Sequence, residues 1–347
     1  MAKIKLVAID LAKRCYQVGA IDEHGKVIYN RRYSPGKFAL AMQQLEPTII
    51  AMEACAAAHY WGRRLTALGH QVRLIPPQHA IAFRRVHKSD AHDTLGIAEA
   101  AQRPNIHFVP VKSVAQQDLQ LLGRMRERLV AQRTALINQA RGFAAEYGVS
   151  FPKRRDVLMR QLPQALGDAS NELSAVARAA LADLLGQIRE LDARLKALMQ
   201  QLSALAGEDP AYQQLLTIPG IGPSVAPALL ASIGHGQQFA SARRCSAWVG
   251  LVPKQHGTGG RTQLGAITKS GDRNLRVMLI HGARAVIVWA HRHSHAQSRW
   301  ISQLIARRGK HKAIVALANK LMRIVWAVLR YGVSFQMSKA FRPQVAH

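Results

Sequence analysis

The chain has 347 residues, and its 48 lysines and arginines exceed its 20 aspartates and glutamates, which gives a formal net charge of +28. A surplus of this size predicts a polyanionic partner, because without one the self-repulsion only destabilises a compact fold. The 48% hydrophobic content excludes an intrinsically disordered chain, and three cysteines without a CxxC pair exclude a disulfide framework and argue against structural zinc.

Residues 1–110 are predicted to form one α/β domain. Short apolar runs alternate with helical stretches, and the turn sequence Asp-Glu-His-Gly at 22–25 separates the second strand from the third. The order β-β-β-α-β-α-β-α is that of the ribonuclease H-like (RuvC-like) fold. The predicted strands are 4–10, 16–22, 27–33, 48–53 and 72–75, and the predicted helices are 37–45, 59–68 and 93–101.

Four carboxylates fall at the ends of these elements. Asp10 ends the first strand and Glu53 ends the fourth, and these strands are neighbours in a ribonuclease H-like sheet, so the two side chains are expected side by side. Asp90 and Asp93 stand three residues apart at a helix start, which directs both to one face. We therefore expect the four acids to form a single site.

This acidic set predicts Mg²⁺ as the cofactor. Four like charges repel unless cations neutralise them, and Mg²⁺ prefers oxygen ligands. Two such ions would hold the attacking and the leaving oxygen of a phosphodiester. The helix acids also have simpler alternatives: Asp93 as an N-cap, and Asp90 as the ion-pair partner of Lys88 or Arg85.

Two long helices are expected in 111–207, a linker or assembly region. In 114–143 a leucine or phenylalanine recurs every seven residues, and 181–205 follows the alternating 3-4 spacing of a coiled-coil seam. The segment 151–163, with prolines and arginines, is expected to be the turn between antiparallel helices. Periodicity leaves two roles equally open, pairing within the chain and assembly of protomers.

The last domain, 208–335 with a tail at 336–347, is expected to be mainly helical and to bind nucleic acid. From residue 210 onward nineteen lysines and arginines stand against the single acid Asp272, a net charge of +18, and such residues displace counterions from phosphates. The sequence LTIPGIGP has the form of a helix-hairpin-helix, in which Gly220 and Gly222 let amide groups face a phosphate. A solvated basic face and a plain helix-turn-helix packing unit are the alternatives.

Six motifs in chain order resemble one family. Together they resemble the bacterial insertion-sequence transposases that join an N-terminal RuvC-like DEDD domain to a C-terminal serine-type transposase domain, the bridge-RNA-guided recombinases. The resemblance covers nearly the whole chain. The motifs are AIDLAK with Asp10, MEAC with Glu53, KSDAHD with Asp90 and Asp93, IPGIGP, AWVGLVPKQHGTGGRTQLGAITKSGDRNLR, and IVALANKLMRIVWAVL.

The resemblance implies a mechanism and partners. In such a family the DEDD acids bind Mg²⁺, and a hydroxyl of the C-terminal domain attacks a DNA phosphate to form a covalent intermediate. Donor and target DNA are chosen by base pairing to a structured guide RNA encoded beside the transposase. The acids and the hydroxyl come from different protomers, so the resemblance implies a homo-oligomer, a dimer or a tetramer, and gives the seam of 181–205 a role in assembly.

The expected nucleophile departs from the family pattern. The family commonly has a serine five residues after the proline of Gly-Leu-x-Pro, and that position here is Thr258, five residues after Pro253. Threonine has the required hydroxyl, but its β-methyl restricts the side chain and crowds an in-line attack. Ser270 and Thr262 are the competing hydroxyls, and a phosphate contact is the alternative role for Thr258.

Basic residues surround Thr258 and are expected to hold the scissile phosphates and to stabilise charge in the transition state. Glycines on either side of Thr258 would let the backbone approach DNA closely. The expected nucleic-acid contacts are Lys254, Arg261, Lys269, Arg273 and Arg276.

Three functions follow, in order of preference. The first is an RNA-guided DNA recombinase, an enzyme acting by phosphodiester transesterification. The second is a metal-dependent, structure-specific DNA nuclease of junction-resolvase type, which needs the acids but neither Thr258 nor a guide RNA. The third is a non-catalytic basic nucleic-acid-binding protein, which needs none of the acids. The sequence has no apolar run of bilayer length, so we expect a cytoplasmic protein without a membrane partner.

Overall fold

The structure, a computed structural model, describes residues 3–13, 15–83 and 89–341. The chain divides into two compact units, Met1–Val114 and Ala115–His347. The first unit is mixed α/β, and the described part of the second is helical apart from one β-hairpin. Among the described residues, no helix is both long enough and apolar enough to cross a bilayer.

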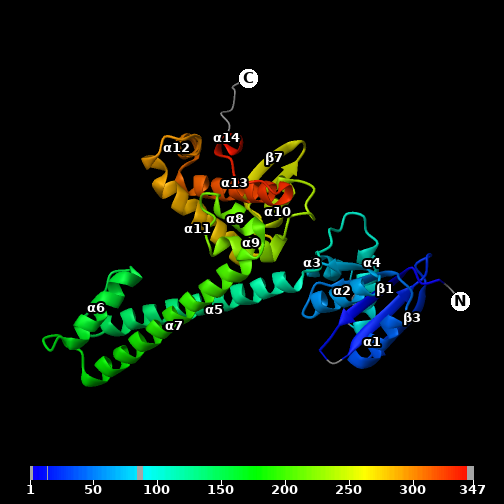
Figure 1. Ribbon diagram of the computed structural model, residues 1–347, viewed down its shortest axis with the longest axis horizontal. Coiled ribbons are helices and arrows are strands. Elements are labelled where there is room, and N and C mark those ends of the chain that lie inside the picture. The colour runs from blue at the N-terminus through cyan, green and yellow to red at the C-terminus, as the bar shows by residue number, and fades with distance from the viewer. Residues whose placement is uncertain (1–2, 14, 84–88, 342–347) are drawn as a thin grey trace. The chain divides into compact units, whose positions relative to one another are not determined.

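The first unit contains a five-stranded sheet in the order β3-β2-β1-β4-β5 (Figure 1). Strands β1 (Leu6–Leu11), β2 (Tyr16–Ile21) and β3 (Val27–Tyr33) pair antiparallel, whereas β4 (Ile49–Glu53) and β5 (Gln71–Ile75) run parallel to β1. This mixed sheet agrees with the ribonuclease H-like prediction. The expected pairing of the first strand with the fourth is confirmed.

One face of the sheet is covered by α1 (Pro35–Gln43) and α2 (Ala58–Ala67). Their apolar residues pack on Val7 and Ile9, which point to this face because side chains alternate along β1. Trp61 of α2 is buried in the same cluster. The odd-numbered residues of β1 therefore belong to this core, and the even-numbered residues face the other way.

The opposite face carries Leu6 and Ala8 and is covered by α4 (Asp90–Ala101), with α3 (Pro77–Ala82) packed on α4. The sequence predicts α4 from residue 93, and the helix begins three residues earlier. It does not predict α3, a six-residue helix that starts with a proline in its first turn, where the ring is tolerated. This is the face on which the predicted acidic residues lie.

In the second unit, α5 (Val114–Ala145) and α7 (Ala175–Gly207) form an antiparallel helical hairpin (Figure 1). The leucine seam of α7 is buried against α5 of the same chain, so of the two roles that periodicity leaves open the structure shows packing within the chain. Because the seam is already covered, it offers no support for assembly of protomers. The helices share hydrophobic clusters in opposite order: Leu119 with Leu202, Leu129 with Leu195, and Ile137 with Ile188.

The segment 151–163 lies between the antiparallel helices α5 and α7, as predicted, but it is not a plain turn, because residues 155–163 are helical. Helix α6 (Arg155–Gly167) closes the far end of the hairpin. Leu158 and Leu162, one helical turn apart, are fully buried in a cluster with α5 and α7. Pro163 lies inside this helix, so the apolar stripe outweighs the helix-breaking tendency of proline.

The rest of the second unit is built around α13 (Lys310–Tyr331), whose ten buried residues make it the centre of the core. Other helices pack on it, which confirms the prediction of a mainly helical C-terminal region. The helices in direct contact with it are α8 (Pro210–Leu216), α10 (Ala242–Trp248), α11 (Arg273–Trp289) and α12 (Ala296–Arg308). Around them, α9 (Val225–Ile233) packs on α8 and α11, the short 3₁₀ helix η1 (Ala290–Arg292) on α11 and α12, and α14 (Met337–Ala340) on α12.

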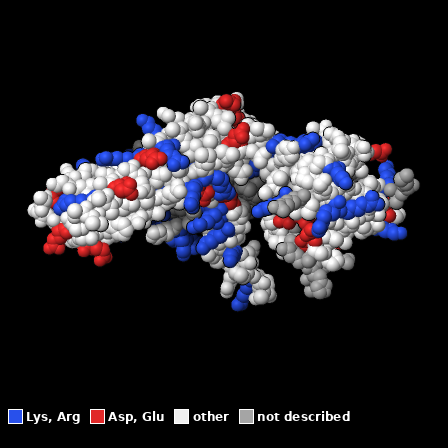
Figure 2. Space-filling model, turned by 90° about the horizontal axis from the view of Figure 1, so that it is seen from below, with Lys and Arg blue, Asp and Glu red and all other residues white. Residues whose placement is uncertain are grey.

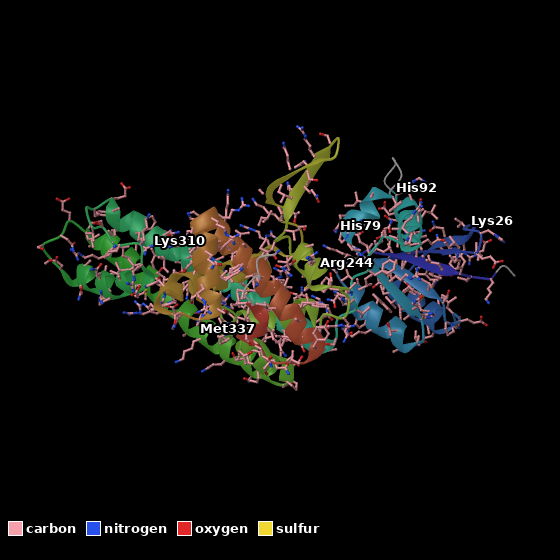
Figure 3. All side chains as sticks on the ribbon, turned by 90° about the horizontal axis from the view of Figure 1, so that it is seen from above. Lys26, His79, His92, Arg244, Lys310 and Met337 are labelled. Atoms are coloured by element: carbon pink, nitrogen blue, oxygen red, sulfur yellow. The ribbon has the colours of Figure 1, made fainter. Side chains whose placement is uncertain are left out.

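One β-hairpin, β6 (Pro253–Thr258) and β7 (Arg261–Ile267), stands apart from these helices, and the sequence does not predict it. Gly259 and Gly260 connect the strands with φ of 55° and 77°, the positive values that a two-residue type I′ turn requires. Every residue of β6, and every residue of β7 except the last, is exposed. The hairpin therefore extends away from the core of its unit (Figure 3).

Candidate functional site

The parallel pairing of β1 with β4 positions the first two acids. The register runs from Leu6 opposite Ile49 to Ile9 opposite Met52, and the next step along both strands is Asp10 and Glu53. Residues two apart in a strand point to the same face, so Asp10 lies on the face of Leu6 and Ala8, and Glu53 on the face of Ala51. These apolar residues share one cluster with α4, so both carboxylates face α4.

The start of α4 lies over the same end of the sheet. Thr94, in its first turns, packs against Gly19, which pairs with Ala8 of β1, whereas Ala101 at the helix end is clustered with Leu6. Helix α4 therefore runs opposite to β1, and its first turn, with Asp90 and Asp93, reaches the carboxyl end of β1. The four predicted acids thus come from three elements that converge on one edge.

The Cys55 thiol lies near two of the acids. Its pKa is raised first by burial, and then by the negative charges of Glu53 and Asp10. Both carboxylates are therefore within electrostatic reach of the same sulfur. Cys55 follows Glu53 in a tight backbone turn, in which its N–H donates to the Glu53 carbonyl at 2.8 Å.

The structure resolves the alternative roles of the two helix acids. Ser89, not Asp93, is the N-cap of α4, because its hydroxyl accepts the backbone N–H of His92 at 3.3 Å. Asp90 does form an ion pair, but with Arg32 of β3 at 2.9 Å, a partner that the sequence analysis missed. The partners considered from the sequence, Lys88 and Arg85, lie outside the described residues.

The acids do not form a closed metal-binding group as they stand. In the part of the chain that the structure describes, no three acidic, histidine or cysteine side chains lie close enough to hold a metal ion. The Arg32–Asp90 pair is largely exposed, with side chains 64% and 45% accessible, and such pairs contribute only about 0–1 kcal/mol.

Thr258, the expected nucleophile, lies at the tip of the exposed hairpin. It is the last residue of β6 and pairs with Arg261 across the two-glycine turn. Of the competing hydroxyls, Thr262 lies on the next strand of the same tip, and Ser270 donates to the Ala247 carbonyl at 3.3 Å in the loop before α11. Thr258 and Ser270 are both exposed, but Ser270 is held by hydrogen bonds to Thr268 and Ala247.

Four of the five predicted basic contacts are exposed and one is not. Lys254, Arg261, Lys269 and Arg273 are accessible on the hairpin and at the start of α11. Arg276 is only 7% exposed, and its guanidinium donates to the carbonyls of Val249 at 2.8 Å and Ser270 at 2.7 Å. The prediction that Arg276 holds a phosphate is therefore corrected: it fastens two loops of the fold.

Gly220 also has a packing role where the sequence predicts a phosphate contact. A Cβ on Gly282 of α11 would lie 2.1 Å from the Gly220 carbonyl oxygen, and a Cβ on Gly220 would lie 3.0 Å from the Gly282 oxygen. The glycine pair thus lets the turn between α8 and α9 lie directly on α11. Gly222, by contrast, has open space where a Cβ would be.

The single acid of the C-terminal region, Asp272, is used by the fold. It caps α11, accepting the N–H of Leu275 at 2.9 Å, and it pairs with Arg124 of α5 at 3.0 Å. It therefore neutralises little of the exposed basic surface. Figure 2 shows groups of lysine and arginine side chains exposed on the face that it draws.

The contrast between Arg273 and Arg276 is testable because both lie in the first turn of α11. Arg276→Gln should lower the free energy of unfolding by about 1.5–3 kcal/mol, since it removes hydrogen bonds from a charged donor to two carbonyls. Arg273→Gln should leave stability within about 0.5 kcal/mol. Urea unfolding followed by circular dichroism measures both, and equal stabilities of the two variants would contradict the packing role of Arg276.

Comparison with known proteins gives consistent results over both units. The family described as "Transposase", with a DEDD domain of the IS110 type, matches residues 7–148, and the family described as "Transposase IS116/IS110/IS902 family" matches residues 212–299. A probable family 20 transposase of Pseudomonas aeruginosa is 44% identical over 93% of this chain and 96% of its own length.

Two further relatives carry informative names. The transposase for insertion sequence element IS1111A of Coxiella burnetii is 38% identical over 95% of this chain and 90% of its own. A pilin gene-inverting protein of Moraxella bovis is 36% identical over 35% of this chain and 37% of its own. With family matches on both units and relatives of this coverage, the chain belongs to the IS110/IS116/IS902 family of insertion-sequence transposases and is a DNA transposase.

Proposed function

We propose that this transposase is an RNA-guided DNA recombinase of a mobile insertion sequence, with an acidic Mg²⁺ site in its first unit and a hydroxyl nucleophile in its second. The observation that carries the proposal is the convergence of Asp10 and Glu53, at the ends of paired parallel strands, with the acids of the first turn of α4. A structural role gives no reason to bring four negative charges to one edge of a sheet in a chain so rich in cations.

The donor set fits Mg²⁺ by its chemistry. Asp10, Glu53, Asp90 and Asp93 offer only carboxylate oxygens, the ligands that Mg²⁺ prefers, and all four are partly buried. Bound Mg²⁺ supplies charge stabilisation at the phosphodiester. Asp90, which pairs with Arg32 in the structure, would hold the ion together with the other three acids, and Arg32 would then be available as a donor for a DNA phosphate.

Thr258 is proposed to be the nucleophile. Its Oγ1 attacks the DNA phosphorus, the Oγ1–P bond forms, and the bond to the deoxyribose oxygen breaks. The hydroxyl proton goes to solvent, and the leaving oxygen takes up a proton, so the step consumes no energy source. Attack by the freed hydroxyl of another DNA end reverses these changes and joins the new strands. Exposed Lys254 and Arg261 on the same hairpin hold the phosphate during the exchange.

Thr258 and the four acids belong to different compact units, so the proposed site is composite. We propose, as the resemblance implies, that the acids of one protomer act with the hydroxyl of another in a dimer or a tetramer. The hairpin supports this arrangement, because Thr258 lies at the tip of a protruding ribbon whose strands are exposed. The pilin gene-inverting relative, by its name, acts in DNA rearrangement, which is also consistent with strand exchange.

Removing single acids tests the proposed metal site. Asp10→Asn and Glu53→Gln should each lower strand exchange about 100-fold or more, because several kcal/mol of charge stabilisation is lost. Glu99→Gln is the matched control, since Glu99 lies on α4 but is exposed and paired with Arg103. A plasmid recombination assay at fixed Mg²⁺ measures all three. Wild-type rates for the acid variants would contradict the proposed acidic metal site.

Substitution at the hairpin tip tests the nucleophile. Thr258→Ala should abolish covalent protein–DNA adducts and strand exchange, whereas Thr258→Ser should retain or raise them, because it keeps the hydroxyl and removes the β-methyl. Thr262→Ala, on the neighbouring strand, is the control. Adducts are separated on denaturing gels with end-labelled DNA. Undiminished cleavage by Thr258→Ala would favour the metal-dependent nuclease.

The proposed guide RNA is tested by sequencing the RNA that co-purifies with the protein. The protein should be expressed with the non-coding DNA that flanks its gene, purified, and its bound RNA sequenced. As the resemblance implies, we expect one discrete structured RNA that matches the flanking DNA; the net charge of +18 in the C-terminal region supports binding to RNA in general. A random sample of cellular RNA would argue against guidance while leaving DNA transposition intact.

A further inference from the structure

A pocket of about 230 Å³ lies between the two long helices of the hairpin. Helix α5 contributes Arg126 and Arg133, and α7 contributes Asp192, Lys196 and Met199. These residues recur at three- to seven-residue spacings, so each helix presents one face to the pocket. The pocket includes Leu195 of the leucine seam, and none of the site acids or candidate nucleophiles lines it.

The charges of this pocket are not balanced. Three cationic side chains line it, against the single carboxylate of Asp192. Asp192 accepts a hydrogen bond from Arg133 at 2.9 Å and another from Arg155 of α6. The one anion is therefore shared between two guanidinium groups, and neither Arg126 nor Lys196 has a carboxylate in the pocket to itself.

The two arginines also keep unused hydrogen-bonding capacity. The Nε of Arg133 is buried and has no partner among the described residues. The Nε of Arg126 donates to the thioether sulfur of Met199 at 3.2 Å, and a thioether is a weak acceptor. Burial, and then the charge of Arg133, lower the pKa of Arg126. A cation that is partly desolvated beside another cation destabilises the fold unless an anion joins it.

We infer that this pocket binds a phosphate group of a nucleic-acid backbone and so makes the helical hairpin a nucleic-acid-binding element. The inference rests on the proposed function only for the identity of the polymer. A phosphate accepts from several donors at once, and the planar guanidinium matches its oxygens in paired hydrogen bonds. The overall charge of +28 favours a nucleic acid over an acidic protein segment as its source.

The test compares two arginines in one turn of α5. Arg126 lines the pocket, whereas Arg128 is exposed outside it, and Arg126→Met and Arg128→Met each remove one positive charge. Arg126→Met should weaken binding of DNA or RNA about tenfold or more and reduce the slope of log affinity against log salt by about one. Arg128→Met should change affinity less than about twofold. Fluorescence anisotropy on labelled DNA and RNA, in parallel, shows which polymer uses the pocket.

A second measurement uses inorganic phosphate as the probe and does not depend on recombination. At constant ionic strength, phosphate should raise the melting temperature of the wild-type protein and of Arg128→Met, and should have no effect on Arg126→Met. Without phosphate, Arg126→Met should melt no lower than the wild type, because the substitution removes a desolvated cation and keeps an apolar stem. The pair Lys196→Gln and Arg194→Gln repeats the comparison on α7, where Arg194 faces Glu190 outside the pocket.

Three results would overturn the inference. The first is equal loss of affinity in the pocket and control variants. The second is a lower melting temperature of Arg126→Met with an unchanged response to phosphate, which makes Arg126 a structural residue. The third is an altered oligomeric state at unchanged affinity, which identifies an acidic side chain of a second copy as the occupant. Phosphate binding in a protein that shows no recombination would refute the proposed function and leave this site standing.

Discussion

The parallel pairing of β1 with β4 is the constraint on which the candidate site depends. Parallel neighbours need a long connection, and here β2, β3 and α1 supply it, so residues 43 positions apart lie side by side with the same orientation. The alternation of side chains then sends Asp10 and Glu53 to the α4 face, while Val7 and Ile9 build the core on the other. A one-residue slip of this register would exchange the acids with the apolar core residues.

The first unit gathers negative charge at one edge of its sheet, and the second unit has an excess of positive charge. Asp272 is consumed by a helix cap and an ion pair, and Asp192 is shared by two arginines. From residue 210 onward nineteen lysines and arginines stand against Asp272 alone, so the region has a large excess of positive charge for an external anion. The acidic edge of the sheet in the first unit and the exposed cations of the second are thus complementary in charge, and in the proposed function a metal ion and a phosphate backbone would bind to them.

The sequence predicts features that depend on patterns along the chain, and it misses features that depend on contacts between residues far apart in the chain. The strand order and the adjacency of Asp10 and Glu53 follow from apolar runs and a known topology, and the structure agrees. Arg276 is misjudged and the packing role of Gly220 is missed, because these roles come from contacts with Val249 and Gly282, which no spacing reveals. The β6–β7 hairpin lacks the alternation of buried and exposed side chains that marks a half-buried strand. Its Gly-Gly pair is a signal for a two-residue turn.

The hairpin also has a consequence for the proposed chemistry. A nucleophile on an exposed two-stranded ribbon, held by backbone pairing and not by a core, gains no activation from its own surroundings. In the proposed mechanism, this hydroxyl would react only when DNA and the carboxylates of another protomer are brought to it. In the proposed composite site, that dependence confines strand breakage to the complete assembly, in which a partner strand is present for rejoining. The separation of Thr258 from the acids between two units would thus protect the DNA as much as it would serve the reaction.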